Sequence, residues 1–337
     1  MTAFSGPGGP LVSVILPARR PREDQFHQAI ESVLSQTYRN LELILVDDGI
    51  GPIPAATAQD SRVRLVPNRG HGLVDALNTG LAMARGSLAA RMDSDDICHP
   101  QRLELQVEAI MGQGMDIAGT GVEIFGQSGR GSGYALYQDW INSLTDPERI
   151  RREIFVESPL AHPSVMMKMT AARALGGYRD MGWPEDYDLW LRAMEAGYVI
   201  GKIPRILLRW RDGAGRLSRT DPRYSKDNFI RLKAHFLART ALKEKKALIW
   251  GAGKTGGMLA RRLKQEGVQV RAFIDISPRK IGGAKAERPV FAPERAMDRQ
   301  ADELIIGAVC ARGARELIRA RLNEFGKVEG LDYLMAS

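Results

Sequence analysis

The stretch Leu88-Ala89-Ala90-Arg91-Met92-Asp93-Ser94-Asp95-Asp96 places three carboxylates directly after an apolar run. The run predicts a strand over residues 87–92 that ends in an acidic turn. Carboxylates this close raise one another's pKa unless a cation lies between them. A hard divalent metal with oxygen ligands, Mg²⁺ or Mn²⁺, is a suitable cation. A solvated acidic turn is the alternative, and this stretch alone does not decide between the two.

Strands and helices alternate upstream of this turn. Apolar runs predict buried strands over residues 11–16, 41–46 and 62–67, and helical spacing predicts helices over residues 26–35 and 71–85. Such units indicate an α/β fold with a mainly parallel sheet, whose ligands lie at the carboxyl ends of the strands. Pro17, Asp47-Asp48 and the acidic turn all follow strands, so we expect them at one edge of the sheet.

Five stretches of the chain, in order, resemble glycosyltransferase family 2. They are VSVILP (12–17), LELILVDDG (41–49), ALNTG (76–80) with AARMDSDD (89–96), AHPSVMM (161–167), and GGYR (176–179) with PEDYDLWLR (184–192). The resemblance covers about residues 11–220. It implies a GT-A nucleotide-diphospho-sugar transferase domain, which is an α/β domain with a mixed, mainly parallel sheet flanked by helices.

The resemblance also implies a donor site for a nucleotide-diphospho-sugar. The residues that would hold the donor are Pro17, Ala18, Arg19, Asp47, Asp48, Arg69, Asp93 and Ser94. Mn²⁺ or Mg²⁺ would bridge the two phosphates, with Asp95 as the main ligand and Asp93 facing the ribose or a metal-bound water. Asp96 is expected to fix the loop. For Arg69, a solvated surface position is the alternative to a phosphate contact.

A second acidic site, Glu185-Asp186, follows Pro184. Inverting members of the family use a carboxylate here as general base, and we expect Asp186 to serve, with Glu185 as the alternative. Acidic residues also suit the first turn of a helix, and both roles can hold together.

Three further residues have roles implied by the resemblance. His162 and Trp183 are expected on the acceptor side, where the acceptor is a hydroxyl of a glycan or of a lipid-linked precursor. For His162 the alternative is a structural role. Asp212 stands where the family has a His near the metal, so Asp212 is a candidate oxygen ligand. The alternative is a closing loop that works without a ligand at this position.

A different pattern begins after residues 221–246, which predict a basic helical connector. A strand over residues 247–250 runs into Gly251-Ala252-Gly253-Lys254-Thr255-Gly256, a helix follows, and the next strand ends before Asp275. This G-x-G-x-x-G with a later acid fits the Rossmann fingerprint. A P-loop would need glycine where Leu248 stands. We expect a Rossmann-like domain over residues 247–337, which either binds a second nucleotide-type ligand or serves as a scaffold.

Composition and charge limit the kinds of ligand and partner that this chain can have. The 337 residues carry a net charge of +8, with much of the excess between residues 202 and 246. That charge suits phosphorylated substrates or an anionic membrane surface, and the absence of interleaved basic and aromatic residues predicts no nucleic-acid partner. Cys98 and Cys310 have no metal-ligand spacing and are expected to be reduced. Residues 1–10 are rich in Gly and Pro and are predicted to be disordered.

No secretory signal and no apolar run of ~18 residues is evident. We therefore expect a cytoplasmic protein, with peripheral contact at the anionic inner face of the membrane left open. The leading hypothesis is an inverting, metal-dependent glycosyltransferase. The alternatives are a non-catalytic nucleotide-sugar-binding or regulatory protein, with the C-terminal domain as ligand sensor, and a transferase fused to a Rossmann oxidoreductase.

Overall fold

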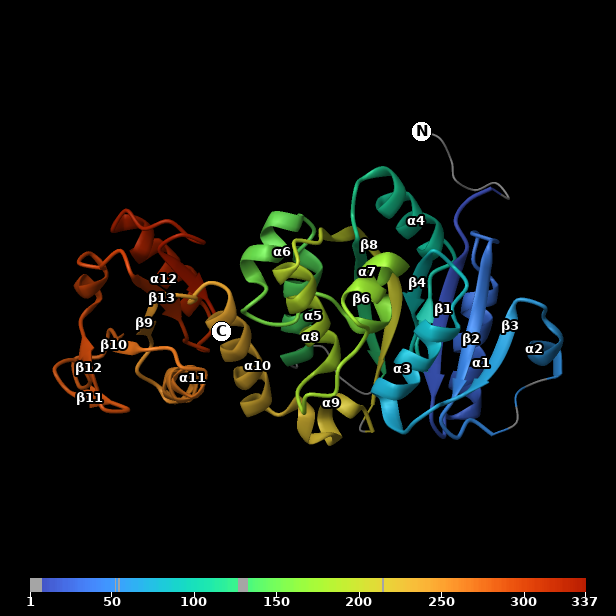
Figure 1. Ribbon diagram of the computed structural model, residues 1–337, viewed down its shortest axis with the longest axis horizontal. Helices are drawn as coiled ribbons and strands as arrows, with labels where there is room; N and C mark the ends of the chain where they lie inside the picture. The colour runs from blue at the N-terminus through green and yellow to red at the C-terminus, as the bar shows by residue number, and fades with distance from the viewer. Residues whose placement is uncertain (1–7, 52, 54, 127–132, 214) are drawn as a thin grey trace. The chain divides into compact units, whose positions relative to one another are not determined.

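The computed structural model describes residues 8–337 except residues 52, 54, 127–132 and 214 (Figure 1). The chain forms two compact units. The first runs through Arg151 and includes Pro159–Met181 and Glu185–Thr220, and the second comprises Arg152–Ser158, Gly182–Pro184 and Asp221–Ser337. Two short segments of the transferase-like sequence therefore group with the C-terminal residues.

The sequence predicts disorder over residues 1–10, of which residues 1–7 lie outside the described residues. The next three residues are placed. The carbonyl of Gly9 accepts a hydrogen bond from Asn40, and that of Pro10 accepts one from Tyr38. These two hydrogen bonds hold Gly9 and Pro10 in place, and the disorder predicted for the N-terminus stays a prediction.

The first unit contains a mixed sheet with the strand order β3-β2-β1-β4-β7-β6-β8-β5. The strands are β1 Val12–Ala18, β2 Leu41–Asp47, β3 Val63–Pro67, β4 Leu88–Arg91, β5 Ile97–Cys98, β6 Ile117–Gly126, β7 Met166–Lys168 and β8 Ile200–Asp212. Pairs β1–β2, β2–β3, β1–β4 and β6–β8 are parallel, and β7 and β5 pair antiparallel to their neighbours. The predicted mainly parallel, mixed α/β sheet is therefore present.

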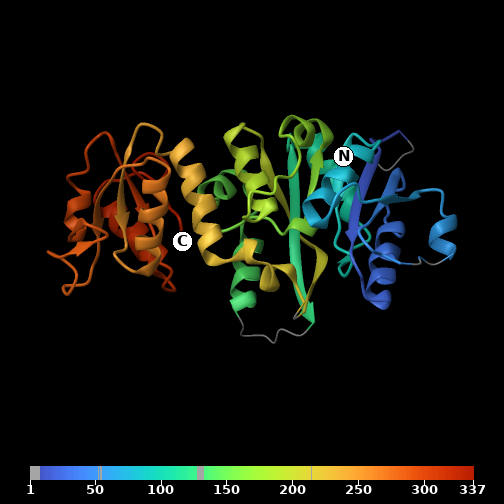
Figure 2. The ribbon, with the colours of Figure 1, turned by 60° about the horizontal axis from the view of Figure 1, so that its bottom comes forward.

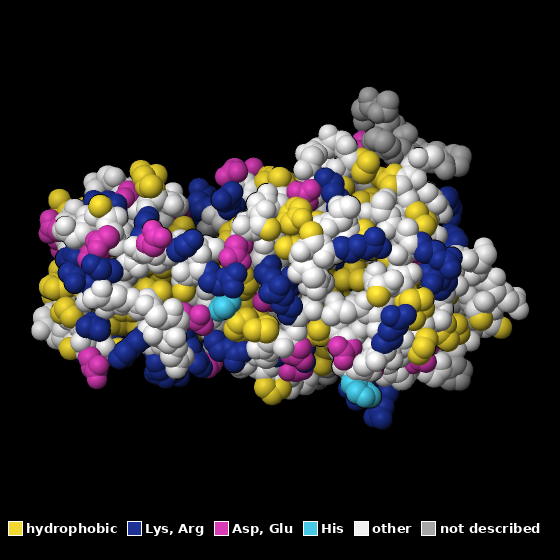
Figure 3. All heavy atoms as spheres, viewed as in Figure 1, with side chains coloured by type: hydrophobic (Ala, Val, Ile, Leu, Met, Phe, Trp, Pro, Cys, Tyr) yellow, Lys and Arg dark blue, Asp and Glu magenta, His cyan; other side chains and the backbone are white. Residues whose placement is uncertain are grey.

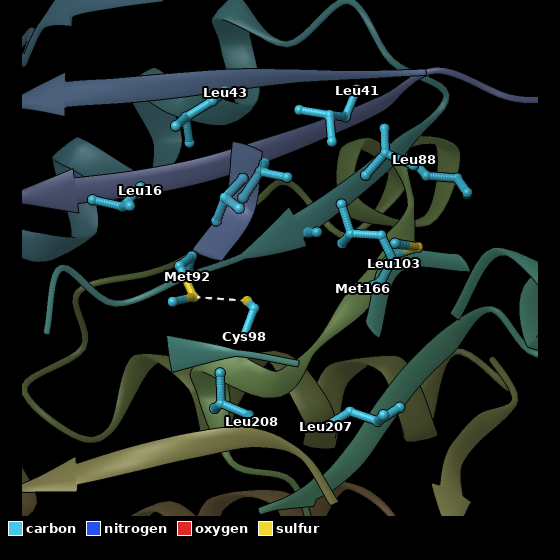
Figure 4. Packing of buried hydrophobic residues seen from close by; sticks show 14 of the residues in the cluster. Leu16, Leu41, Leu43, Leu88, Met92, Cys98, Leu103, Met166, Leu207 and Leu208 are labelled. Carbon is cyan, nitrogen blue, oxygen red and sulfur yellow. Dashed lines mark hydrogen bonds between the residues drawn. The ribbon is translucent and has the colours of Figure 1, made fainter. Parts of the chain in front are cut away.

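Helices accompany this sheet in chain order. They are α1 Glu23–Leu34, α2 Ala55–Gln59, α3 Gly72–Met83, α4 Arg102–Gly112, α5 Gly133–Ser143, α6 Pro147–Glu153, α7 Met169–Ala174, α8 Glu185–Glu195 and α9 Leu217–Thr220, with the short 3-10 turn η1 at His162–Ser164. Apolar side chains of the strands and of α1 and α4 form one buried cluster, in which Met92 and Cys98 lie together (Figure 4). Burial of each large apolar side chain contributes about 1.5–3 kcal/mol.

One glycine fixes the entry to β4, the strand that leads into the acidic turn. A Cβ atom on Gly86 would lie 2.4 Å from the Leu11 carbonyl oxygen and 2.8 Å from the Ser13 amide nitrogen. Only glycine permits β4 to start so close to β1. The position of the acidic turn at the far end of β4 follows from this contact.

The second unit contains a smaller mixed sheet with the order β11-β12-β10-β9-β13-β14 (Figures 1 and 2). The strands are β9 Lys246–Trp250, β10 Val270–Ile274, β11 Ala284–Lys285, β12 Arg288–Phe291, β13 Glu303–Gly307 and β14 Tyr333–Met335. All pair in parallel except β11 with β12. Its helices are α10 Lys226–Arg239, α11 Lys254–Gln265 and α12 Ala314–Glu324, with the 3-10 turns η2 Pro222–Tyr224 and η3 Pro293–Ala296.

The predicted basic connector, residues 221–246, contains η2 and α10 and belongs to the second unit. Helix α10 packs beside α11 there. On the face shown in Figure 3, Lys and Arg side chains are spread among apolar and acidic ones. None of the described helices combines the length and apolar character of a membrane span.

Candidate active site

Three strands bring the predicted donor residues to one edge of the first sheet. Strand β1 pairs with β2 so that Ala18 lies opposite Asp47, and with β4 so that Ile15 lies opposite Arg91. The amide of Met92 continues the pairing by donating to the Ile15 carbonyl at 3.1 Å. The carboxyl ends of all three strands, Pro17 included, therefore meet, as expected for parallel strands.

The Asp47-Asp48 turn contains two carboxylates with different surroundings. One oxygen of Asp47 accepts hydrogen bonds of 2.7 Å from the amides of Gly49 and of the residue after it, and Gly49 has a φ of 103°. The Asp48 carboxylate accepts from the Asn68 side chain at 3.0 Å and lies 3.9 Å from the Arg19 guanidinium. Asp47 therefore shapes the turn, and Asp48 pairs with a residue of the first strand end.

Arg69, another predicted donor residue, is exposed in the turn after β3. Its guanidinium lies 3.3 Å from the Met83 sulfur, and its amide donates to the Thr79 hydroxyl. The contact with Met83 makes no use of the positive charge of Arg69.

Asp93, Asp95 and Asp96 form the acidic cluster, with Ser94 between the first two. One carboxylate oxygen of each lies within 4.8 Å of the other two. Burial, and then the charge of Asp93, raises the pKa of Asp95 to about 6. Asp96 is fully buried, and burial followed by its two acidic neighbours raises its pKa well above the usual value. A hard cation with oxygen ligands would relieve this repulsion.

Two arginines hold the acidic cluster in place. Arg91, only 4% exposed, forms an ion pair with Asp93. Arg211 donates its amide to Oδ1 of Asp96 and its Nε–H to the Asp95 carbonyl, both at 2.7 Å. These bonds fasten the acidic turn to the end of β8.

Asp212, the predicted third metal ligand, lies outside the three-carboxylate group that the described residues form. Its carboxylate is buried, and its Oδ2 accepts a hydrogen bond of 2.9 Å from Arg219. Its Oδ1 forms ion pairs with Arg219 at 2.8 Å and with Arg216 at 3.7 Å. To bind a metal, Asp212 would have to leave these two arginines.

The second acidic site begins helix α8, as predicted from its position after Pro184. Glu185 is 1% exposed, whereas Asp186 is partly exposed. Oδ1 of Asp186 accepts the amide of Tyr187 at 2.7 Å, a contact of the first helical turn. Of the two predicted base residues, Asp186 is the one in contact with solvent.

His162 lies in η1 and is buried. Its Nε2 lies 2.9 Å from the Tyr178 hydroxyl, and its Nδ1 lies 3.8 Å from the Glu185 carboxylate. Burial, followed by the positive charge of Arg91, lowers the pKa of His162 well below its usual value. Burial also raises the pKa of Tyr178. The two rings therefore form a neutral, buried pair beside Glu185.

Sequence relatives identify the family. The model described as glycosyl transferase family 2 matches residues 13–176. EpsE of Bacillus subtilis (strain 168), named as a glycosyltransferase, is 34% identical over 235 residues, covering 66% of this chain and 80% of EpsE. The chain belongs to glycosyl transferase family 2. It is a glycosyltransferase that uses a nucleotide-sugar donor.

A second relative supports this glycosyltransferase assignment, and a solved structure shows the fold. The O-antigen biosynthesis glycosyltransferase WbnJ of Escherichia coli is 30% identical over 208 residues, covering 59% of this chain and 75% of WbnJ. The crystal structure of S. aureus TarS residues 1–349, in complex with UDP-GlcNAc, aligns with a TM-score of 0.55 at 17% identity, covering 75% of this chain and 71% of that one. The TarS likeness shows that the fold is GT-A-like.

Trp183 of the glycosyltransferase lies in the second unit, two residues before α8. Its ring is 5% exposed, its centre lies 5.3 Å from that of His235, and the Arg231 guanidinium lies 4.7 Å above it. Stacking on an acceptor sugar, as the sequence suggested, would require the ring to leave this packing.

The predicted C-terminal ligand loop of the enzyme joins β9 to α11. Gly251 has a φ of 122°, and a Cβ on Gly256 would lie 1.9 Å from the Gly251 carbonyl oxygen. A Cβ on Gly253 would meet nothing within 4 Å, and Lys254 is exposed beside the partly exposed Thr255. Two glycines of the loop thus serve packing, and the third faces open space.

Asp275, the acidic residue of the Rossmann fingerprint, forms hydrogen bonds with residues of its own unit. Its carboxylate accepts hydrogen bonds of 2.9 Å from Ala252, Ser277 and Lys280. Burial raises its pKa, but these bonds outweigh that effect and lower it overall. A ribose hydroxyl would therefore compete with bonds that already fix the loop.

Several residues at the transferase site were missed from the sequence. They are Arg91, Tyr178, Arg211, Arg216 and Arg219. Arg91 offered a signal, since a charged residue inside an apolar strand needs a partner nearby. Arg216 and Arg219 offered no such signal, because the segment after β8 that contains them has no hydrophobic periodicity.

Proposed function

We propose that this family 2 enzyme is an inverting, divalent-metal-dependent glycosyltransferase that moves a sugar to a hydroxyl of a glycan or lipid-linked acceptor. The observation that carries the proposal is the acidic cluster at the shared carboxyl ends of β1, β2 and β4. Its carboxylates repel one another, and an oxygen-ligated cation would balance them.

The residues fit Mn²⁺ or Mg²⁺ by the chemistry of their donor atoms. Asp95 and Asp93 would hold the ion, while Asp96 anchors the turn through Arg211. When bound, the ion neutralises charge on the leaving nucleoside diphosphate. Arg91 keeps Asp93 oriented through their ion pair.

The nucleotide would lie along the first two strand ends. Asp48, beside Arg19, is better placed than Asp47 to accept from a base N–H or a ribose hydroxyl, because Asp47 already closes its turn. Pro17 and Ala18 would line the same edge. The TarS structure was solved with UDP-GlcNAc, and we therefore propose a UDP-sugar as the first donor to test.

Asp186 would act as general base. Its carboxylate takes the proton from the acceptor hydroxyl as that oxygen bonds to the anomeric carbon and the bond to the diphosphate breaks, so configuration inverts. Partial exposure favours Asp186 over the buried Glu185. The O-antigen function in the name of WbnJ supports an acceptor in surface-polysaccharide biosynthesis.

We propose that the second unit is Rossmann-like and that its glycine loop takes a nucleotide-type ligand. The open space beside Gly253 and the exposed Lys254 support a ligand. The scaffold alternative is supported by Asp275, whose hydrogen bonds are internal.

Transfer from a panel of UDP-sugars tests the main proposal. Asp95→Asn and Asp186→Asn should each lower turnover by at least about 10²-fold. Glu195→Gln, on the exposed far end of α8, is the matched control and should retain activity. Wild-type turnover in both site variants would refute the assigned roles.

A further inference from the structure

Arg211 fixes the end of β8 against the acidic cluster. Its amide bond to Asp96 places its two neighbours, Trp210 and Asp212, on either side of this contact. Gly126 of β6 lies opposite Asp212, and a Cβ on Gly126 would be 2.5 Å from the Asp212 carbonyl oxygen. The two strands therefore stay in close contact up to Asp212, which limits the movement of this strand end.

Arg216 is held by both neighbours of Arg211. Its guanidinium carbon lies 4.2 Å from the centre of the Trp210 ring, and its Nη1 lies 3.7 Å from Oδ1 of Asp212. Arg219 bonds to the same carboxylate. The Asp212 side chain is 0% exposed and that of Arg216 is 12% exposed, so a buried carboxylate restrains a nearly buried guanidinium.

The partners of Arg216 connect it to the acidic cluster. Trp210 and Asp212 flank Arg211 in the chain. Arg211 itself donates its amide to Asp96 and its Nε–H to the Asp95 carbonyl, both at 2.7 Å. Arg216 is therefore held at the strand end that is fastened to the acidic cluster.

We propose that Arg216 binds the donor diphosphate at the acidic cluster, and that Asp212 is a positioning residue for Arg216 rather than a metal ligand. This rests on the proposed function, since it needs a diphosphate at that cluster. A guanidinium matches phosphate oxygens with paired, charge-assisted hydrogen bonds. Trp210 and Asp212 restrict the Arg216 side chain before the donor arrives, which lowers the entropy cost of binding.

Calorimetric titration with inorganic pyrophosphate in saturating Mg²⁺ tests Arg216 without knowledge of the sugar or base. Arg216→Gln should weaken pyrophosphate binding at least about tenfold. Arg205→Gln is the matched control, because Arg205 lies on β8, the strand that precedes Arg216, and bonds to Gln101 at an exposed position. It should change the affinity less than about twofold. Equal affinity in wild type and Arg216→Gln would overturn the inference.

Titration with Mg²⁺ alone separates the two roles of Asp212. Asp212→Asn should keep the affinity for Mg²⁺ but weaken the binding of pyrophosphate. The double variant Asp212→Asn/Arg216→Gln should bind pyrophosphate only slightly more weakly than Asp212→Asn alone, because both changes act through one interaction. Arg216→Gln should not weaken Mg²⁺ binding, since it removes a competing positive charge. Loss of Mg²⁺ binding in folded Asp212→Asn would make Asp212 a ligand and overturn its positioning role.

Asp212→Asn could unfold the protein, because it leaves two arginines beside an uncharged buried group. Thermal unfolding is therefore measured first, and Arg216→Lys provides the second variant. Lysine keeps the charge without the paired donors, so binding weaker than wild type and tighter than Arg216→Gln is expected. If wild type binds no Mg²⁺-pyrophosphate, the proposed donor site fails together with this inference. If wild type binds and Arg216→Gln binds equally well, only the inference fails.

Discussion

The Tyr178 hydroxyl lies 2.9 Å from Nε2 of His162, and both side chains are buried. Burial disfavours the protonated form of His162, so its pKa in the folded protein lies well below the unfolded value of about 6.5. In acid, the unfolded chain therefore binds a proton at this position more readily than the folded chain does.

Stability should accordingly depend on His162 below pH 6.5. The free energy of unfolding should fall as the pH drops through about 6.5 and below, because protonation favours the unfolded chain. His162→Gln should show a smaller loss between pH 7 and pH 5 than wild type in denaturant unfolding. His71→Gln, at an exposed position, should follow the wild-type curve. Identical curves for wild type and His162→Gln would contradict a buried neutral histidine.

Metal binding should be sensitive to pH because of Asp95. Its pKa of about 6 means that protons compete with the metal near that pH. We expect Mn²⁺ affinity, measured by calorimetry, to fall at least about tenfold from pH 7.5 to pH 5, and Asp95→Asn to bind weakly throughout. Mn²⁺ affinity that is flat over this range would contradict a ligand role for Asp95.

Trp183 should matter for stability more than for acceptor recognition. Trp183→Ala removes a buried ring packed on His235 and should cost about 3–5 kcal/mol in unfolding free energy. Trp183→Phe keeps much of the packing and should leave the KM for the acceptor within about twofold of wild type. A large rise in that KM in a stable Trp183→Phe protein would restore an acceptor-side role.

The C-terminal loop offers a matched pair of glycine substitutions. Gly256→Ala should destabilise the protein by about 1–3 kcal/mol, since the new methyl would overlap the Gly251 carbonyl. Gly253→Ala should keep the melting temperature within about 2 °C, because its methyl would face open space.

The same Gly253→Ala protein tests the ligand proposal for that loop. If a nucleotide such as NAD⁺ or UDP approaches the backbone there, binding to the second unit should weaken on substitution. Unchanged stability together with no nucleotide binding in wild type would favour the scaffold alternative.

The sequence was most informative where structure is local. Apolar runs predicted β1, β2 and β4 closely, and the parallel arrangement brought Asp47, Asp48 and Asp95 to one edge as expected. These features depend on patterns within a few residues and on rules for parallel strands.

The hydrogen-bond and ion-pair partners of individual side chains could not be predicted from the sequence. Asp212 resembled a metal ligand by position, yet it pairs with arginines that follow in a segment without periodicity. Asp275 fitted the Rossmann fingerprint by spacing, yet it bonds to Ala252 and Ser277 of its own unit. In both cases the competing donors come from short neighbouring segments whose conformation no local pattern specifies.

Titration of UDP into the protein, with and without Mn²⁺, tests the central claim most directly, because it needs neither the sugar nor the acceptor. UDP should bind wild type at least about tenfold more tightly with Mn²⁺ than without it, and Asp95→Asn should abolish this dependence. UDP binding at the first unit that is equally tight without Mn²⁺ and in Asp95→Asn would contradict a metal-dependent donor site at the acidic cluster.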